Sequence, residues 1–366
     1  MKLKIRDITS KLEALAPPSF QESYDNAGLI VGHPNDEVDA VLLTLDVTEE
    51  VIDEAISTGA NLIIAHHPIV FKGLKQFNGK NYVERCVIKA IKNDVAIYAS
   101  HTNLDSVPGG VNTKMCEKLG LQDCQILSPM KGQLLKLVTF VPVEHAEKVR
   151  EAIFAAGAGH IGNYDQCSFN LPGEGTFRGS ENTNPFVGER GKQHTEKEVR
   201  VETVLPRYRK SKVLRALLES HPYEEVAYDF YPLENEWFET GMGMVGSLPE
   251  AMDEKTFLLK VKETFACGAV RHTRLLNKPV EKVALCGGSG SFLLNEAKAS
   301  GADVFITGDF KYHQFFDAED KLVIADIGHY ESEQFTKEVF YEILTKNFPN
   351  FAIRLSEVKT NPVNYL

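Results

Sequence analysis

The chain has 366 residues, of which 43% are hydrophobic and 25% charged, a composition typical of globular proteins that excludes disordered and fibrous classes. The 40 Lys and Arg residues against 51 Asp and Glu give a net charge of −11, the wrong sign for nucleic-acid binding through phosphates. No apolar run reaches the ~20 residues of a membrane span, and the first residues lack the apolar block of a signal peptide, so a cytoplasmic location is expected.

The first ~125 residues alternate between buried strands and amphipathic helices, the pattern of a parallel α/β sheet. Strand 39–45 leads into helix 48–59, with Thr48 and Asp46 as candidate caps. A second strand, 61–65, runs straight into His66-His67-Pro68, and a third, at 95–100, runs into His101 after helix 81–93. The six cysteines form no C-x-x-C pair, which predicts reduced thiols rather than disulfides or a thiolate zinc site.

The same pattern returns near the C-terminus, in strand 282–286, helix 291–301 and strands 303–307 and 321–327, before a final helix at 331–347. At an offset of 242 residues the two stretches share identical residues at several positions: Val41, Leu43, Glu54, Ala55, Gly59, Ala60 and Ile64 match Val283, Leu285, Glu296, Ala297, Gly301, Ala302 and Ile306. At an offset of 228, His101 falls on His329 and Asp105 on Glu333. We interpret this as an internal duplication; the alternative is chance similarity of two βαβ units.

Residues 130–235 differ in character and read as β-α-β-β-α-β, the order of a small ferredoxin-like α+β unit. We therefore predict a duplicated α/β core with helices on both sheet faces, formed by 1–129 and 236–366, and an inserted domain at 130–235. Gly241, Gly243 and Gly246 spell G-x-G-x-x-G without the strand and helix of a dinucleotide site, so a linker turn is expected there.

Histidines and carboxylates follow three strands of the predicted core. His66 and His67 come after the second strand, and His101 precedes Asp105 after the third. His329 and Glu333 follow the last strand, at a spacing that brings both side chains to one helix face. Because ligands gather at the carboxyl ends of parallel strands, these side chains are expected on one rim.

Such a set, with imidazole and carboxylate but no thiolate, suits two divalent ions per subunit. Zinc is the expected metal, with manganese or iron as alternatives. Carboxylates such as Asp105 or Glu333 can bridge two cations, and incomplete coordination by protein would leave positions for water, as in catalytic sites. His101 remains open: a sixth ligand, a general acid or base, or a side chain that orients Asp105.

Three further signals lie near the same rim. Gly287–Gly290 sits between a strand and a helix, as a tight turn or a phosphate-binding loop. Asp309 aligns with His67 and is followed by Lys311, Tyr312 and His313, which could reach a substrate. The segment Tyr24–Gly28 reads as a polar turn that faces the rim.

The chain resembles the dinuclear-metal family of GTP cyclohydrolase 1 type 2 homologues, the Nif three-like proteins. The resemblance rests on YDNAGL at 24–29, HHP at 66–68, HTNLD at 101–105, ITGD at 306–309 and GHYESE at 328–333. It implies five metal ligands: His66, His67, Asp105, His329 and Glu333. It also implies that Asp105 or Glu333 bridges, that His101 lies in the site as a non-ligand, that the protein is a toroidal homohexamer, and that the insert is PII/CutA-like.

We therefore predict a metal-dependent hydrolase of a nucleotide or similar small phosphorylated substrate, with His101 moving protons. The alternatives are a non-enzymatic hexameric scaffold or regulatory protein, whose metals are structural and whose insert senses a ligand, and a metal buffer. No membrane or nucleic-acid partner is expected.

Overall fold

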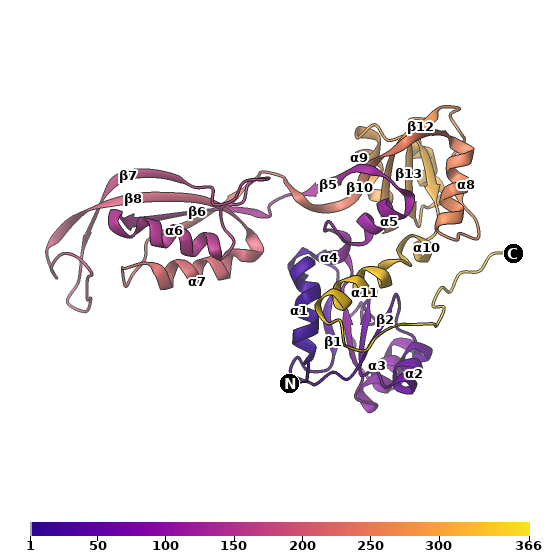
Figure 1. Ribbon diagram of the computed structural model, residues 1–366, viewed down its shortest axis with the longest axis horizontal. Helices are drawn as coiled ribbons and strands as arrows, with labels where there is room; N and C mark the ends of the chain where they lie inside the picture. Colours follow the sequence, from indigo (N-terminus) through magenta and orange to yellow (C-terminus); the bar gives the residue numbers. More distant parts are fainter. Residues whose placement is uncertain (1) are drawn as a thin grey trace. The chain divides into compact units, whose positions relative to one another are not determined.

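The structure is a computed structural model that describes residues 2–366. The chain folds into two compact units. The first unit combines Met1–Pro129 with Phe238–Leu366, and the second is Met130–Trp237 (Figure 1). Among residues 2–366, no helix has both the length and the apolar character that crossing a membrane requires.

The N-terminal half of the first unit is built on a mixed five-stranded sheet of order β1-β4-β3-β2-β15. Its centre is a parallel trio, β2 (Val41–Thr44), β3 (Leu62–Ala65) and β4 (Ala96–Ala99), in which every residue is buried. β1 (Gly28–Val31) pairs antiparallel with β4, and β15 (Ile353–Leu355) pairs parallel with β2. The continuous apolar runs found in the sequence are therefore strands covered on both faces.

The helices around this sheet begin and end where the sequence provides caps. The side chain of Thr48 accepts from the Val51 N–H at the start of α2, and Gly59 closes that helix in the left-handed conformation. Asp46, the other candidate cap, serves a different role, described below. The α-helices of this half are α1 (Ile5–Leu15), α2 (Glu49–Thr58), α3 (Tyr82–Lys92) and α4 (Thr102–Asp105), and the next helix, α5 (Val111–Leu119), packs against β12 of the C-terminal half.

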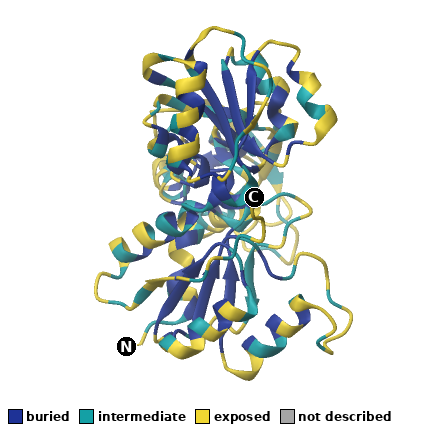
Figure 2. Cartoon of the chain, turned by 90° about the vertical axis from the view of Figure 1, so that its right-hand side faces the viewer, coloured by how far each residue is buried: buried dark blue, intermediate teal, exposed yellow. Residues whose placement is uncertain are grey.

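The C-terminal half has its own six-stranded mixed sheet of order β11-β14-β13-β12-β10-β5. Its strands are β5 (Gln122–Met130), β10 (Trp237–Asp253), β11 (Arg271–His272), β12 (Pro279–Ser289), β13 (Val304–Gly308) and β14 (Val323–Asp326). Its helices are α8 (Glu254–Thr264), α9 (Leu294–Ala299) and α10 (His329–Glu333), whereas α11 (Thr336–Asn347) packs against α1, β2 and β15 of the N-terminal half. The helix predicted at 331–347 is thus two helices. Figure 2 shows the strands of both sheets as the buried centre, with exposed residues on the surrounding helices.

The two sheets repeat one arrangement. In each, a parallel trio (β2-β3-β4 or β12-β13-β14) carries an antiparallel strand on its last member, β1 or β11. They differ at the other edge, where β15 is parallel to β2 but β10 is antiparallel to β12. The α/β class with mixed sheets is confirmed, and the two halves form two sheets.

The linker turn predicted at Gly241–Gly246 is wrong, because these residues lie inside the long strand β10. A Cβ at Gly241 would collide with the Ser128 carbonyl oxygen, and one at Gly246 would lie 2.7 Å from Cys124 Sγ. The glycines therefore allow β5 to approach β10 closely.

The second unit has a four-stranded antiparallel sheet of order β7-β8-β6-β9. Its elements are β6 (Leu134–Pro142), α6 (Ala146–Ala155), β7 (Phe169–Arg178), β8 (Gln193–Pro206), α7 (Lys210–Ser220) and β9 (Tyr228–Leu233). One sheet face packs on both helices through apolar residues such as Leu137, Val141, Val149 and Val213. Short 3₁₀ helices complete the chain: η1 (Pro18–Phe20), η2 (Val143–His145), η3 (Arg207–Arg209), η4 (Ser291–Leu293) and η5 (Tyr312–Ala318).

Candidate metal centre

Segments after strands of both sheets bring the predicted site residues together in the first unit. From the N-terminal sheet, β3 leads directly to His66 and His67, and β4 leads to His101 and the short helix α4, which ends at Asp105. From the C-terminal sheet, β14 leads to α10, whose first and last residues are His329 and Glu333. The site is therefore shared by the carboxyl ends of two parallel trios, not by the rim of one sheet.

Glu333 lies at the centre of this group. Its Oε2 is 2.9 Å from Nε2 of His67 and 3.1 Å from Nε2 of His329, while its Oε1 is 3.6 Å from Nε2 of His66. Two sets of donor atoms, each within 4.8 Å of one another, therefore share this carboxylate: His67 with His329, and His66 with Asp105. A third set joins His66, His67 and His101.

Each of the four histidines is fixed through its Nδ1 atom. The acceptors are the Ser100 carbonyl for His66 (2.9 Å), Asp46 for His67 (2.7 Å), Asp25 for His101 (2.7 Å) and Asp309 for His329 (2.7 Å). Because these partners only accept, Nδ1 carries a proton, and each ring would bind a metal through Nε2 once that nitrogen has lost its own proton.

Two buried atoms in the centre lack hydrogen-bond partners. Nε2 of His66 and Oδ1 of Asp105 are both buried and unsatisfied, and they lie 3.6 Å apart. Buried polar atoms nearly always have hydrogen-bond partners in folded proteins. This pair therefore indicates a partner that accepts a lone pair from each of the two atoms. Imidazole and carboxylate donors fit a divalent cation of the zinc, iron or manganese type.

The charges of the centre also fit a cation. Burial and the nearby Glu333 raise the pKa of Asp105 well above its ordinary value. Burial would raise the pKa of Glu333 too, but His329 and His66 outweigh it and lower that pKa. Burial opposes charge on His67 and His329, yet their carboxylate partners raise these pKa values to about 9 and about 11. The ring protons thus neutralise carboxylates that a bound cation would neutralise instead.

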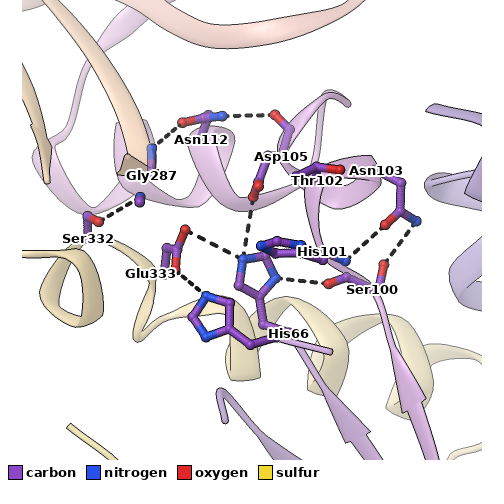
Figure 3. A network of polar contacts seen from close by, with 12 residues as sticks. His66, Ser100, His101, Thr102, Asn103, Asp105, Asn112, Gly287, Ser332 and Glu333 are labelled. Atoms are coloured by element: carbon purple, nitrogen blue, oxygen red, sulfur yellow. Dashed lines mark hydrogen bonds and ion pairs between the residues drawn. The ribbon is translucent and has the colours of Figure 1, made fainter. Parts of the chain in front are cut away.

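Two polar side chains join the end of β12 to the segments that carry Asp105 and Glu333 (Figure 3). Asn112 donates to the Asp105 carbonyl (2.8 Å) and accepts from the Gly287 N–H (2.8 Å). The Gly288 N–H donates to Ser332 Oγ (2.9 Å), and a Cβ at Gly288 would collide with Glu333 Oε1. Gly287–Ser289 are therefore not the tight turn expected from the sequence but the end of strand β12, where the missing side chain of Gly288 leaves room for Glu333 and the amides of Gly287 and Gly288 are engaged within the protein.

His101 is oriented by residues of the polar turn at 24–28. Asp25 Oδ1 accepts from His101 Nδ1, and Asp25 Oδ2 accepts from the N–H (3.1 Å) and the hydroxyl (2.5 Å) of Thr102. The other ring nitrogen of His101 is left for the centre. This arrangement of carboxylate, imidazole and an open nitrogen is that of a positioned general acid or base.

The orienting carboxylates were the residues that sequence reasoning did not assign. Asp46 appeared as a helix cap, but it binds His67 and also accepts from Thr360 Oγ1 (2.6 Å) near the C-terminus. Asp25 and Asp309 had been placed near the rim without a partner. The only signal in the sequence was their position in polar turns after or beside buried strands; Thr360 gave none.

Replacing Asp46 with asparagine is expected to weaken metal binding by about 10–100-fold, because the carboxylate that orients His67 and raises its basicity is lost. Competition with a chromophoric chelator measures this affinity. Asp39→Asn, an exposed aspartate that pairs with Lys2, is the control and should bind metal as the wild type does. Equal affinities for Asp46→Asn and wild type would contradict the role of Asp46.

Asp25 gives the metal-free protein a defined response to acid. Burial would raise the pKa of Asp25, but hydrogen bonds from His101 and Thr102 outweigh it and lower the pKa to about 2. A depressed folded-state pKa stabilises the fold above the unfolded value near 4, and this contribution disappears as pH falls toward 2. Asp25→Asn should therefore lose about 1–2 kcal/mol at pH 7 but little at pH 2. Urea unfolding with EDTA across this range tests it; a constant difference at all pH values would contradict it.

A pocket of about 380 Å³ opens onto the centre. Its lining includes the side chains of the centre, His67, His101, Asp105, His329 and Glu333, and three aromatic side chains, Tyr24, Phe71 and Phe292. These three are 45–60% exposed, although each is large and apolar enough to be buried in a core. The pocket therefore combines polar side chains that can bind metal with flat apolar surfaces.

Comparisons with known proteins find similar sequences and structures along nearly the whole chain. The chain is 44% identical over 359 residues to a "GTP cyclohydrolase 1 type 2 homolog" of Halalkalibacterium halodurans, covering 97% of this chain and 96% of that protein. It is 41% identical over 367 residues to the Bacillus subtilis protein of the same name, covering 99% and 98%. The crystal structure of a Bacillus cereus protein related to NIF3 superposes with a TM-score of 0.86 at 42% identity, covering all of both chains. Residues 3–362 match the sequence profile of Duf34/NIF3 (NGG1p interacting factor 3), and the chain belongs to this family.

Proposed function

We propose that the protein is a metal-dependent hydrolase that holds two divalent ions and acts on a nucleotide or a similar small phosphorylated molecule. The observation that carries this proposal is the position of Glu333, whose two oxygens face different histidines. Its carboxylate would bridge two ions, one held with His67 and His329, the other with His66 and Asp105. Of the two candidate bridging residues, these distances favour Glu333.

In this proposal the ions and the residues around them have different roles. Two divalent ions at such a site supply a hydroxide nucleophile near neutral pH by lowering the pKa of bound water. His101 offers a ring nitrogen within 4.8 Å of donor atoms of His66 and His67 and would accept or donate a proton at the attacked centre. Asp25 holds the His101 ring in one orientation through Nδ1.

The aromatic side chains that line the pocket support a substrate with a planar ring. Tyr24 and Phe71 have ring centroids 6.1 Å apart, and Phe71 lies 6.1 Å from the His101 ring in an edge-on arrangement. Stacking on such side chains favours a nucleobase, so a nucleotide fits this site better than a simple phosphoester. If GTP is the substrate, the attacked atom is C8 of the guanine ring; the relatives are named "GTP cyclohydrolase 1 type 2 homolog".

We also propose that the chain forms a homohexameric ring and that the second unit is a PII/CutA-like ferredoxin-like domain. The support is the resemblance of the motifs and, for the second unit, its element order of strand, helix, two strands, helix, strand. Mass photometry of the purified protein tests the hexamer, and a monomer or dimer at all concentrations would exclude it.

The experiment that tests the activity starts with protein purified without chelator or metal-affinity tag. Mass spectrometry should find about two divalent ions per chain, as a bridged site requires. The loaded protein is then incubated with nucleotides while formate and phosphate release are followed separately. Metal without turnover of any nucleotide would favour the scaffold alternative. Protein that holds no metal even after supplementation would overturn the hydrolase proposal altogether.

A further inference from the structure

The second unit contains a cavity of about 580 Å³ on the side of its sheet opposite the helices. Strand alternation places Leu137 and Val141 of β6 in the helix-facing core, and places Phe140 between them on the other face. The cavity is lined by Phe140 and by residues of β7, β8 and the two loops at 179–186 and 223–227. Its size and largely apolar walls are those of a small-molecule site.

Two glycines of β7 create the space. A Cβ built on Gly173 would meet no atom within 4 Å, and one built on Gly175 would collide with the Glu198 carboxylate. Neither residue has a positive φ, so the backbone does not require glycine at these positions. Glycine inside a strand weakens it and usually marks a close approach of another group. Here the missing side chains leave the floor of the cavity open and let Glu198 lie across it.

Glu198 is a buried carboxylate without a cationic partner. It is 8% exposed, and its Oε1 accepts from the Tyr223 hydroxyl at 2.8 Å. Burial and the neighbouring Glu198 raise the pKa of Tyr223, so this hydroxyl remains a donor. Two arginines, Arg178 and Arg200, also line the cavity. Arg200 forms an ion pair with Glu202, with its Nε 2.8 Å from Oε1, and among residues 2–366 no ion pair to Glu198 is formed. A buried carboxylate that lacks a counter-charge favours binding a cation.

Aromatic rings surround the space above this carboxylate. The Tyr223 ring centroid is 6.0 Å from that of Phe177 and 6.3 Å from that of Phe186. A hydrogen bond from the Asn184 N–H to Glu224 (2.8 Å) connects the loop that carries Phe186 to the loop at 223–227. The faces of aromatic rings attract organic cations, and this attraction grows when the cation is desolvated.

We propose that this cavity binds a small aromatic amine, whose ammonium group pairs with Glu198 and whose ring packs among Phe177, Phe186 and Tyr223. The site is separate from the metal centre and does not depend on the proposed hydrolase activity. It gives the second unit a ligand-binding role, in which a carboxylate and an aromatic enclosure select for positive charge.

Three probes of matched shape and different charge test the proposal on the full-length protein. Phenethylamine, 2-phenylethanol and phenylacetate are compared by saturation-transfer NMR and titration. The amine should bind, the alcohol should bind at least about tenfold more weakly, and the acid should not bind. Glu198→Gln keeps the acceptor for Tyr223 and should remove the preference for the amine. Equal binding of the three probes to wild type would overturn the proposal.

Gly173→Leu adds a side chain whose Cβ meets no atom within 4 Å and which extends into the cavity, so it should abolish amine binding. Asn170→Leu is its control, since it adds the same side chain to the same exposed strand outside the cavity lining. Glu333→Gln, which disables the metal centre, should bind the amine as wild type does. Unchanged amine binding by Gly173→Leu would overturn the proposal. The proposal would also be overturned if the wild type binds no probe and the Gly173→Leu variant has a different assembly state, because this face of the sheet would then be a contact between copies.

Discussion

Replacing Glu333 with glutamine is expected to weaken metal binding by at least about a hundredfold. Glutamine keeps the size of the side chain but removes the charge and one of the two acceptor oxygens that face His66, His67 and His329. Both candidate ion positions share this carboxylate, so both should lose metal together. Metal content per chain after dialysis measures the loss directly.

The stability of the two proteins provides a second measurement. For the wild type, a metal concentration a hundredfold above the dissociation constant should raise the free energy of unfolding by about 2.7 kcal/mol. The variant should gain little at the same concentration. Glu331→Gln is a matched control, because Glu331 is also buried in α10 but binds Asn361 instead of the histidines. Full metal content in Glu333→Gln would show that the ions are held elsewhere.

Replacing His101 with glutamine is expected to lower turnover of the substrate found in the nucleotide screen by about 10²–10⁴-fold while metal content stays unchanged. The substitution removes the titratable ring nitrogen that Asp25 holds toward the centre. His160→Gln, an exposed histidine of the second unit, should leave turnover intact. Parallel loss of metal and turnover would instead make His101 a ligand, as its place beside His66 and His67 also allows.

The sequence alone determined much of the N-terminal half. Its strands carry continuous apolar runs, and Thr48 and Gly59 mark the ends of α2, so local patterns were sufficient to place these elements. The repeat of the pattern around Val283–Ile306 indicated a second set of βαβ elements, and the structure contains this second set in β12, β13 and β14. These features could be predicted because each depends on residues close together in the chain.

Local patterns led to wrong predictions where the role of a residue depends on a contact with a part of the chain distant in sequence. The glycines at 241–246 resemble a turn, but they allow two strands more than a hundred residues apart to pack closely. The final helix, predicted as one element, ends at Glu333 and resumes at Thr336. The first of these short helices holds both His329 and Glu333, so the position of the break belongs to the site.

The candidate ligands could be chosen from the sequence because histidines and carboxylates directly after buried strands are exposed to a common edge. Only the tertiary structure decided that two sheets, not one, share the centre, and that Glu333 rather than Asp105 faces both sets of histidines. It alone showed Asp25, Asp46 and Asp309 on the ring nitrogens, and the cavity above Glu198. Strand and helix periodicity is set by neighbouring residues, whereas hydrogen bonds across 20 to 266 positions of the chain are set by how the elements pack.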